Sequence, residues 1–132
     1  MPDAEPTSDH EFASAQDIEP LALMDGLRAR AVNGERITLA LFELDPGIAM
    51  PEHRHPNEQV GMVVRGEFTF TVGGETRLRQ PGDMWVIPAG LPHSVVRAGE
   101  AGCTIVETFS PPRDDWADKP RLEPSADRWP QA

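Results

Sequence analysis

The chain has one cysteine and few basic residues, and both shortages exclude classes of protein. Cys103 is the single cysteine among 132 residues, so an intramolecular disulfide framework and a multi-cysteine zinc site are excluded. Twelve Lys and Arg residues face 22 Asp and Glu residues, which gives a formal net charge of −10. This balance argues against nucleic acid or an anionic membrane surface as a partner, because either would favour a basic face.

Long apolar stretches are also missing. The first residues, Met1 to Pro6, have neither the basic start nor the apolar run of a signal peptide. No stretch approaches the roughly 20 apolar residues of a membrane span. We therefore expect a cytoplasmic, soluble protein that has neither membrane nor nucleic acid as a partner, and whose length suits one domain with one hydrophobic core.

Proline and glycine are plentiful, and charge divides the chain into three parts. Fourteen Pro and eleven Gly favour short strands and turns over long helices. Residues 1–20 hold six acidic side chains and no Lys or Arg, which predicts a flexible acidic arm. Residues 21–113 are predicted to form the domain. Residues 114–132 are predicted to be a Pro-rich tail whose Trp116 and Trp129 dock on the domain or on a second subunit.

Between the tails, the pattern is that of short β-strands. Residues 67–72 alternate between Phe or Val on one face and Glu or Thr on the other, as expected of a strand with one buried face. Gly73 and Gly74 follow as a hairpin turn, whereas residues 17–30 suit a short helix or turn. Short strands at this spacing imply a sandwich or a barrel. The expected strands are 36–44, 59–64, 67–72, 76–79, 84–87, 93–97 and 103–109.

Three of the four histidines are candidates for a metal site. His53 and His55 are separated by one residue, so on a strand both side chains point to the same face. Neutral imidazole binds zinc, iron, nickel and, together with oxygen ligands, manganese. A lone pair of this kind is weak support, and His10 in the acidic arm is expected to be solvated. His93, later in the chain, would supply a third imidazole.

The residues around these histidines resemble the two sequence motifs of the cupin family. The first motif is matched by Gly47, His53, His55 and Gly66, with Gln59 at a glutamate position, and the second by Gly82, Pro88, Gly90 and His93. The resemblance spans roughly residues 36–110 and implies an all-β fold, the cupin double-stranded β-helix or jelly-roll barrel. It also implies one divalent metal ion (Zn, Mn, Ni or Fe) held by His53, His55, Gln59 and His93.

The glutamine at position 59 departs from the family pattern. A neutral carbonyl oxygen in place of a carboxylate leaves the ion with a higher net charge, and such an ion is a stronger Lewis acid toward a substrate oxygen. The alternative is that Gln59 only forms a hydrogen bond near the ion, which the three histidines then bind alone.

A closer resemblance is to the small single-domain cupins of the pectin-degradation type. It is carried by residues 53–59, 66–68, 85–88 and 107–115. Enzymes of that group convert 4,5-unsaturated uronates from the cyclic hemiacetal to the linear keto form. By position, the resemblance implies that Glu107, Phe109 and Arg113 line the site. This sequence has glutamate at position 107, where the family more usually has aspartate.

The last predicted strand can also be interpreted from its own residues. If Ile105 and Phe109 face the interior, Glu107 faces it too, and a carboxylate buried near a metal ion is a candidate general acid or base. Alternatively, Val106 faces inward and Glu107 faces solvent. Arg113 suits bidentate binding of a substrate carboxylate, or else a surface ion pair with a neighbouring aspartate.

Together these residues predict a metal-dependent enzyme with isomerase-, tautomerase- or lyase-type chemistry. Its substrate would be a small oxygenated acidic metabolite such as an unsaturated uronate, held by Arg113 and Phe109 while Glu107 moves a proton. Two alternatives stay open: a metal-dependent dioxygenase and a non-catalytic small-molecule-binding cupin. Because open sheet edges need covering, we also expect a homodimer, formed through residues 36–44 or through the tails.

Overall fold

The computed structural model describes residues 5–124 of the chain, and nearly all of its regular elements are strands. Residues 5–14 contain neither helix nor strand, and no helix among the described residues has the length and apolar character needed to cross a membrane. The elements are η1 (Ala15–Asp17), β1 (Leu21–Met24), β2 (Leu27–Asn33), β3 (Thr38–Leu44), β4 (Met50–His53), β5 (Glu58–Val72), β6 (Glu75–Arg79), β7 (Met84–Ile87), β8 (His93–Ser110) and η2 (Asp114–Trp116).

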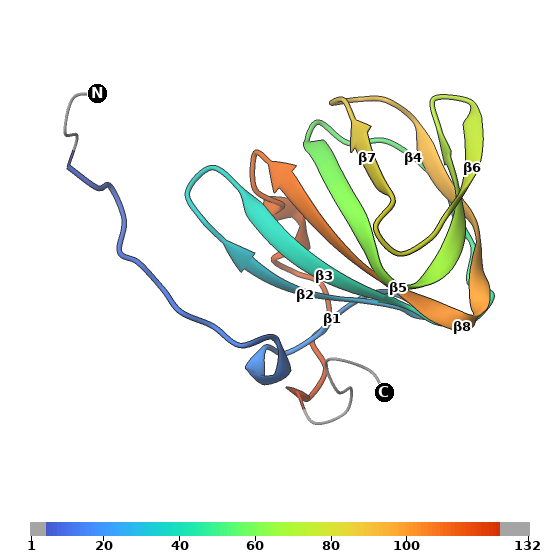
Figure 1. The fold of residues 1–132 in the computed structure, drawn as a ribbon. Helices are drawn as coiled ribbons and strands as arrows, with labels where there is room; N and C mark the ends of the chain where they lie inside the picture. The colour runs from blue at the N-terminus through green and yellow to red at the C-terminus, as the bar shows by residue number, and fades with distance from the viewer. Residues whose placement is uncertain (1–4, 125–132) are drawn as a thin grey trace.

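The strands form one antiparallel sheet that is folded over on itself, which confirms the expected all-β jelly-roll barrel. The strand order is β1-β2-β3-β8-β5-β6, with β4 paired to β8 and β7 paired to β5. Figure 1 shows β2 and β3 on one side, β6 and β7 on the other, and the long strands β5 and β8 bent between them. Both long strands therefore contribute to the two facing halves of the sheet.

Glycine makes these bends possible. Gly66 has a φ of +76°, and a Cβ atom there would lie 2.2 Å from the carbonyl oxygen of Gly102. The sequence predicts separate strands at 59–64 and 67–72, and likewise at 93–97 and 103–109. The structure instead has one continuous strand in each place, because the irregular pairing around the glycines bends the ladder without ending it.

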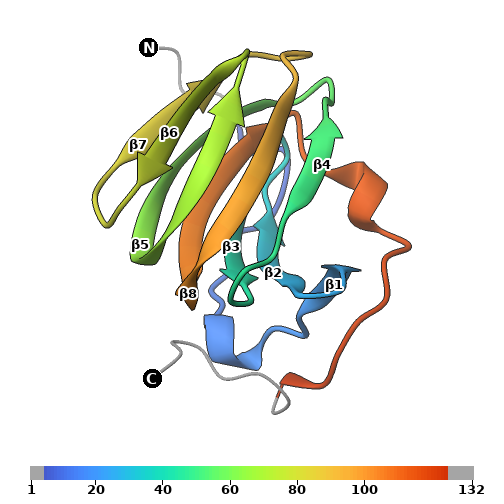
Figure 2. The ribbon, with the colours of Figure 1, turned by 90° about the vertical axis from the view of Figure 1, so that its right-hand side faces the viewer.

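The two ends of the domain differ from the expectation in detail. Residues 17–30 do not form a single helix or turn: the last residue of η1 is followed by β1 and β2. Residues 27–33 pair with β3 over their whole length. This pairing makes the segment a strand although its mixed apolar and basic composition does not predict one. After η2, the chain runs back past β4 and β1 (Figure 2), and Leu21 forms a bridge with Arg121. Trp116 docks on the domain as expected, whereas Trp129 lies outside the described residues.

The interior contains two groups of packed aromatic rings with the histidines between them. One group consists of Phe68, Phe70 and Trp85, and the other of Phe42, Phe109 and Trp116. The ring of His93 lies 6.2 Å from that of Phe70, and the ring of His55 lies 5.8 Å from that of Phe109, measured between centroids. The apolar core thus encloses the predicted site residues and limits their contact with water.

Candidate metal site and cavity

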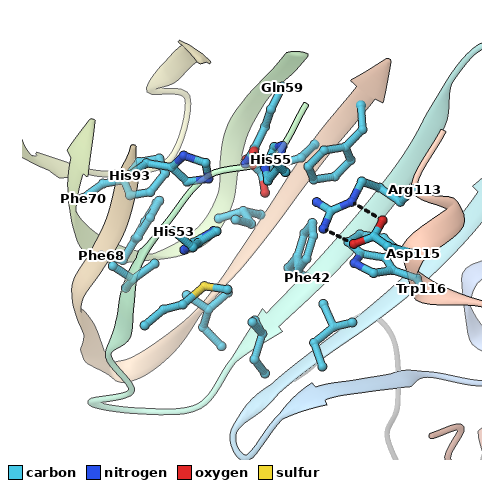
Figure 3. A pocket seen from close by; sticks show the side chains of 18 of the residues that line it. Phe42, His53, His55, Gln59, Phe68, Phe70, His93, Arg113, Asp115 and Trp116 are labelled. Atoms are coloured by element: carbon cyan, nitrogen blue, oxygen red, sulfur yellow. Dashed lines mark hydrogen bonds and ion pairs between the residues drawn. The ribbon is translucent and has the colours of Figure 1, made fainter. Parts of the chain in front are cut away.

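Three imidazoles converge inside the barrel. His53 ends β4 and pairs with His93, the first residue of β8, while His55 lies in the loop after β4. Their candidate ligand nitrogens all lie within 4.8 Å of one another. The rings of His53 and His93 are 4.2 Å apart between centroids, and those of His55 and His93 are 5.1 Å apart. A cluster of this size could hold one metal ion (Figure 3).

Backbone carbonyl groups fix which nitrogen of each ring carries the proton. The Nδ1 atoms of His53, His55 and His93 lie 2.8, 3.1 and 2.9 Å from the carbonyl oxygens of Pro51, Asn57 and Leu91, respectively. A carbonyl oxygen can only accept a hydrogen bond, so each Nδ1 is the donor and each Nε2 keeps its lone pair. This is the tautomer that a metal-binding histidine needs.

Burial favours the neutral form of His55 and of His93. Desolvation lowers the pKa of His93 to about 4 and also lowers the pKa of His55. Within the described part of the chain, the buried Nε2 atom of His93 has no hydrogen-bond partner. A buried lone pair without a donor is costly, and a divalent cation would satisfy it. The residues present therefore fit a metal ion with nitrogen ligands.

Gln59, the second residue of β5, is oriented by its neighbour in the barrel. Its amide nitrogen donates a hydrogen bond to the Oε2 atom of Glu107. Its carbonyl oxygen is therefore turned toward His55, where it lies 2.9 Å from Nε2. Two lone pairs that face each other at this distance repel unless a proton or a cation lies between them. This arrangement supports the prediction that Gln59 is a fourth ligand.

Glu107 faces the interior of the barrel, and the alternative in which it faces solvent is wrong. Its side chain is only 4% exposed, and it accepts a second hydrogen bond from Nε1 of Trp85 at 2.8 Å. A Cβ atom on Gly61 would lie 2.6 Å from Cγ of Glu107 and 2.7 Å from the Trp85 ring, so a glycine is needed opposite. Burial raises the pKa of Glu107 to about 7, which suits proton transfer near neutral pH.

Arg113 lies just beyond β8 and is held on several sides. Its Nε and one of its NH2 hydrogens donate to the carboxylate of Asp115 at 3.0 and 2.9 Å. Its Cζ atom lies 4.8 Å from the ring centroid of Phe109 and 4.5 Å from that of Trp116. The expected alternative, an ion pair with a neighbouring aspartate, is present. It lies at the cavity, however, because the side chain of Arg113 is only 12% exposed.

One cavity of about 170 Å³ joins these groups. The ring of Phe109 contacts both His55 and Arg113. Figure 3 shows the three histidines and Arg113 on different sides of the cavity, which therefore has a histidine end and an arginine end. The structure thus brings together all the residues predicted for the site. They are His53, His55, Gln59, His93, Glu107, Phe109 and Arg113.

Three residues that support this arrangement are not predicted from the sequence to have a role in the site. Asn57 is buried, accepts from His55 through its carbonyl group, and donates through its side chain to the carbonyl oxygen of Pro111. Trp85 binds Glu107, and Asp115 binds Arg113. Trp85 lies within the stretch that carries the family resemblance, but Asn57 shows no local signal of its role, because its partner is 54 residues away.

An antiparallel jelly roll with three convergent histidines defines a class, the β-barrels that hold a candidate metal site inside. The family model described as "Cupin domain" matches residues 40–109, which is more than half of the chain. The chain belongs to the cupin family.

Individual relatives cover different shares of their own length. The pectin degradation protein KdgF of Dickeya dadantii is 27% identical over 96 residues, which are 71% of this chain and 86% of that protein. The auxin-binding protein ABP19b of Prunus persica is 36% identical over 87 residues, 61% of this chain. The match spans 42% of ABP19b, less than half of its length.

A solved structure supports the same family at the level of the fold. The structure of KdgF from Halomonas sp. superposes with a TM-score of 0.75 at 27% sequence identity. The match covers 81% of this chain and 98% of that one. These likenesses support a small cupin of the KdgF type.

Proposed function

We propose that the chain is a metal-dependent enzyme with isomerase-, tautomerase- or lyase-type chemistry on a small acidic oxygenated metabolite. The observation that carries the proposal is the buried Glu107 carboxyl, whose pKa is raised to about 7 and which Gln59 connects to the histidine cluster. A carboxyl buried in this way costs stability, and proton transfer gives a reason for the cost.

The residues that would hold the metal ion are His53, His55, His93 and Gln59. Their neutral nitrogen and oxygen donors suit zinc, manganese, nickel or iron. When bound, such an ion would polarise a substrate oxygen as a Lewis acid. The fixed tautomers and the unpartnered Nε2 of His93 support this ligand set.

The other residues of the cavity would bind and deprotonate the substrate. Arg113 would hold a carboxylate, since a guanidinium can donate two parallel hydrogen bonds. Glu107 would take a proton from the substrate at one carbon or oxygen and return it at another. Gln59 and Trp85 keep the Glu107 carboxylate in place, and Phe109 shields the site from water.

The relatives support both the proposed function and its alternatives. KdgF is described as a pectin degradation protein, which supports an unsaturated uronate as the first acid to assay. The described role of ABP19b, auxin binding, supports a non-catalytic binding function instead. The three-histidine cluster is also compatible with a dioxygenase.

One experiment separates these functions. The purified protein is analysed for metal, loaded in turn with zinc, manganese, nickel and iron, and assayed with 4,5-unsaturated uronate by ultraviolet absorbance and with an oxygen electrode. We expect metal-dependent turnover of a small acid without oxygen uptake. Oxygen uptake with the iron-loaded protein would indicate the dioxygenase, and binding of small acids without turnover would indicate the binding module.

We also propose a cytoplasmic homodimer. The outer face of the sheet carries exposed apolar side chains on adjacent strands, with Met84 66% and Val86 63% exposed on β7. Val60 of β5 pairs with Val86, and Leu39 of β3 lies on the same face two strands away. An apolar face of this kind supports contact with a second subunit, and it includes the expected region 36–44.

A further inference from the structure

The walls of the cavity between its two polar ends are apolar. None of the described residues that line it is Ser, Thr, Tyr or Asn. A ligand in the middle of the cavity therefore meets carbon atoms and not hydrogen-bonding groups. The side chains that form this part of the wall are Leu27, Phe42, Leu44, Phe68, Val95 and Ile105.

The polar groups lie at the two ends and largely bind one another. At one end, Gln59 and Glu107 are hydrogen-bonded together beside the histidines. At the other end, Arg113 binds Asp115, and Lys119 also lines the cavity. Two cations and one anion give the second end a net charge of +1, which one carboxylate would neutralise.

Arg113 keeps donors for that carboxylate. Asp115 occupies Nε and one hydrogen of an NH2 group, and a guanidinium has five donor hydrogens. Its outer edge can therefore still bind a second carboxylate. Figure 3 shows Asp115 on the side of Arg113 that is away from the three histidines. The rings of Phe109 and Trp116 hold the guanidinium in this position.

The size of the cavity limits the body of the ligand. Its volume is about 170 Å³, and an apolar protein cavity of roughly 150 Å³ takes a molecule of the size of benzene. The ring of Phe109 contacts both ends, with its centroid 5.8 Å from that of His55 and 4.8 Å from Cζ of Arg113. A ligand that reaches both ends therefore has a body about one ring long.

We infer that the site takes a monocarboxylic acid with an apolar, ring-sized body and an oxygen at the end opposite the carboxylate. This inference rests on the proposed function, because it assigns the carboxylate to Arg113 and the oxygen to the histidine cluster. A sugar acid fits less well. Its ring hydroxyls would lie against Leu, Phe, Val and Ile side chains, and each buried hydroxyl without a partner weakens binding by roughly tenfold or more.

Three probe compounds test the inference by isothermal titration calorimetry. They are 4-hydroxybenzoate, glucuronate and 4-hydroxybenzyl alcohol, titrated into zinc-loaded protein whose metal content has been measured. We expect 4-hydroxybenzoate to bind at least about tenfold more tightly than either of the others. Equal or tighter binding of glucuronate would overturn the inference.

Two matched variants on neighbouring residues of β8 locate the preference in the cavity wall. Val95 lines the cavity, whereas the side chain of Val96 is exposed on the outside of the sheet. Val95→Thr adds a hydroxyl at nearly constant volume, so it should reduce the preference for 4-hydroxybenzoate over glucuronate by at least about threefold. Val96→Thr should leave both affinities unchanged. Equal effects of the two variants would contradict the inference.

A third variant tests the carboxylate end. Arg113→Met keeps a long side chain against Phe109 and Trp116 but removes the charge. The variant should bind 4-hydroxybenzoate at least about tenfold more weakly, and its affinity for 4-hydroxybenzyl alcohol should be unchanged. An unchanged affinity for 4-hydroxybenzoate would overturn the assignment.

Failure of the proposed function would give a different result. The proposed enzymatic function would be contradicted if the protein bound no metal, or if it bound 4-hydroxybenzoate but turned over no acid with any metal. Neither result would contradict the inferred class of ligand. Protein that is fully loaded with metal and prefers glucuronate would contradict the ligand class alone.

Discussion

The amide nitrogen of Gln59 donates a hydrogen bond to the carboxylate of Glu107. The candidate fourth ligand of the metal and the candidate acid/base therefore depend on each other. The carbonyl oxygen of Gln59 is turned toward His55 only because its amide nitrogen is bound on the other side. A change at Gln59 should therefore alter both metal binding and proton transfer.

Gln59→Glu is the first test of this dependence. The added negative charge should tighten metal binding, but it also replaces a donor by a second carboxylate beside Glu107, so that the two groups must share a proton. The Glu107 carboxyl would then hold its proton differently, and the metal would be a weaker Lewis acid. Both changes should slow turnover by about tenfold or more. Chelator competition measures the metal affinity, and turnover at the wild-type rate would contradict the prediction.

Glu107→Gln should abolish most activity while the metal is retained. The variant keeps the shape and an acceptor oxygen for Trp85 but cannot take up a proton, so turnover should fall by about two to four orders of magnitude. Thr108→Ser, on the opposite face of the same strand, serves as the control and should keep full activity. If Glu107→Gln turns over its substrate at the wild-type rate, the carboxyl has a structural role only.

His93→Ala should remove most of the bound metal from a protein that remains folded. The lost imidazole is the one whose buried Nε2 atom has no partner among the described residues, and the core strands around it persist. Metal analysis after dialysis measures the loss, and circular dichroism measures the fold. His10→Ala, in the N-terminal segment, should keep the full metal content. Full occupancy in His93→Ala would refute the site.

Cys103 should make the protein less stable at alkaline pH. Burial raises the pKa of this thiol from 9.0 to about 12. Above pH 9 the unfolded chain loses the proton that the folded chain keeps, so the free energy of unfolding falls as the pH rises from 9 toward 12. At pH 10 the loss relative to Cys103→Ala should be about 1 kcal/mol. Denaturant unfolding of both proteins at pH 8 and pH 10 measures it, and equal losses would contradict the prediction.

The proposed homodimer should depend on the exposed apolar face. Light scattering of the wild-type protein at micromolar concentration should give about twice the 14.5 kDa of one chain. Charged groups placed at the two most exposed positions, Met84→Lys and Val86→Lys together, should give a monomer, because burying an unpaired charge at an interface is costly. Arg79→Lys, which keeps the charge of a residue on β6, is the control. A wild-type mass of one chain would refute the dimer.

Part of this structure follows from local sequence, and the rest depends on contacts between distant residues. Alternation predicts the strand at 67–72, and motif spacing identifies His53, His55 and His93, because these signals lie within a few residues. The strand at Leu27–Asn33 is missed because its arginines and alanines carry no strand preference, and pairing with β3 decides its structure.

In the site, the positions of Glu107 and Arg113 depend on contacts between distant residues and do not follow from local sequence. The alternation of the last strand leaves two possible faces for Glu107. The choice depends on the pairing of Gly61 with Glu107 and on the space that Gly61 leaves for the Trp85 ring. The position of Arg113 between Phe109 and Trp116 depends likewise on how the C-terminal segment returns to the barrel.

The imidazoles of the metal cluster are oriented by main-chain carbonyl groups, at Pro51, Asn57 and Leu91. A point mutation replaces a side chain and leaves the carbonyl group of that residue in the chain. The apolar wall of the cavity, in contrast, is formed by residues such as Val95 and Ile105, whose side chains a mutation does replace. Substitutions in the cavity wall can therefore accumulate one residue at a time during evolution and change the substrate, while the orientation of the metal-binding histidines is kept. For an engineer, Val95 and Ile105 are the positions to randomise first.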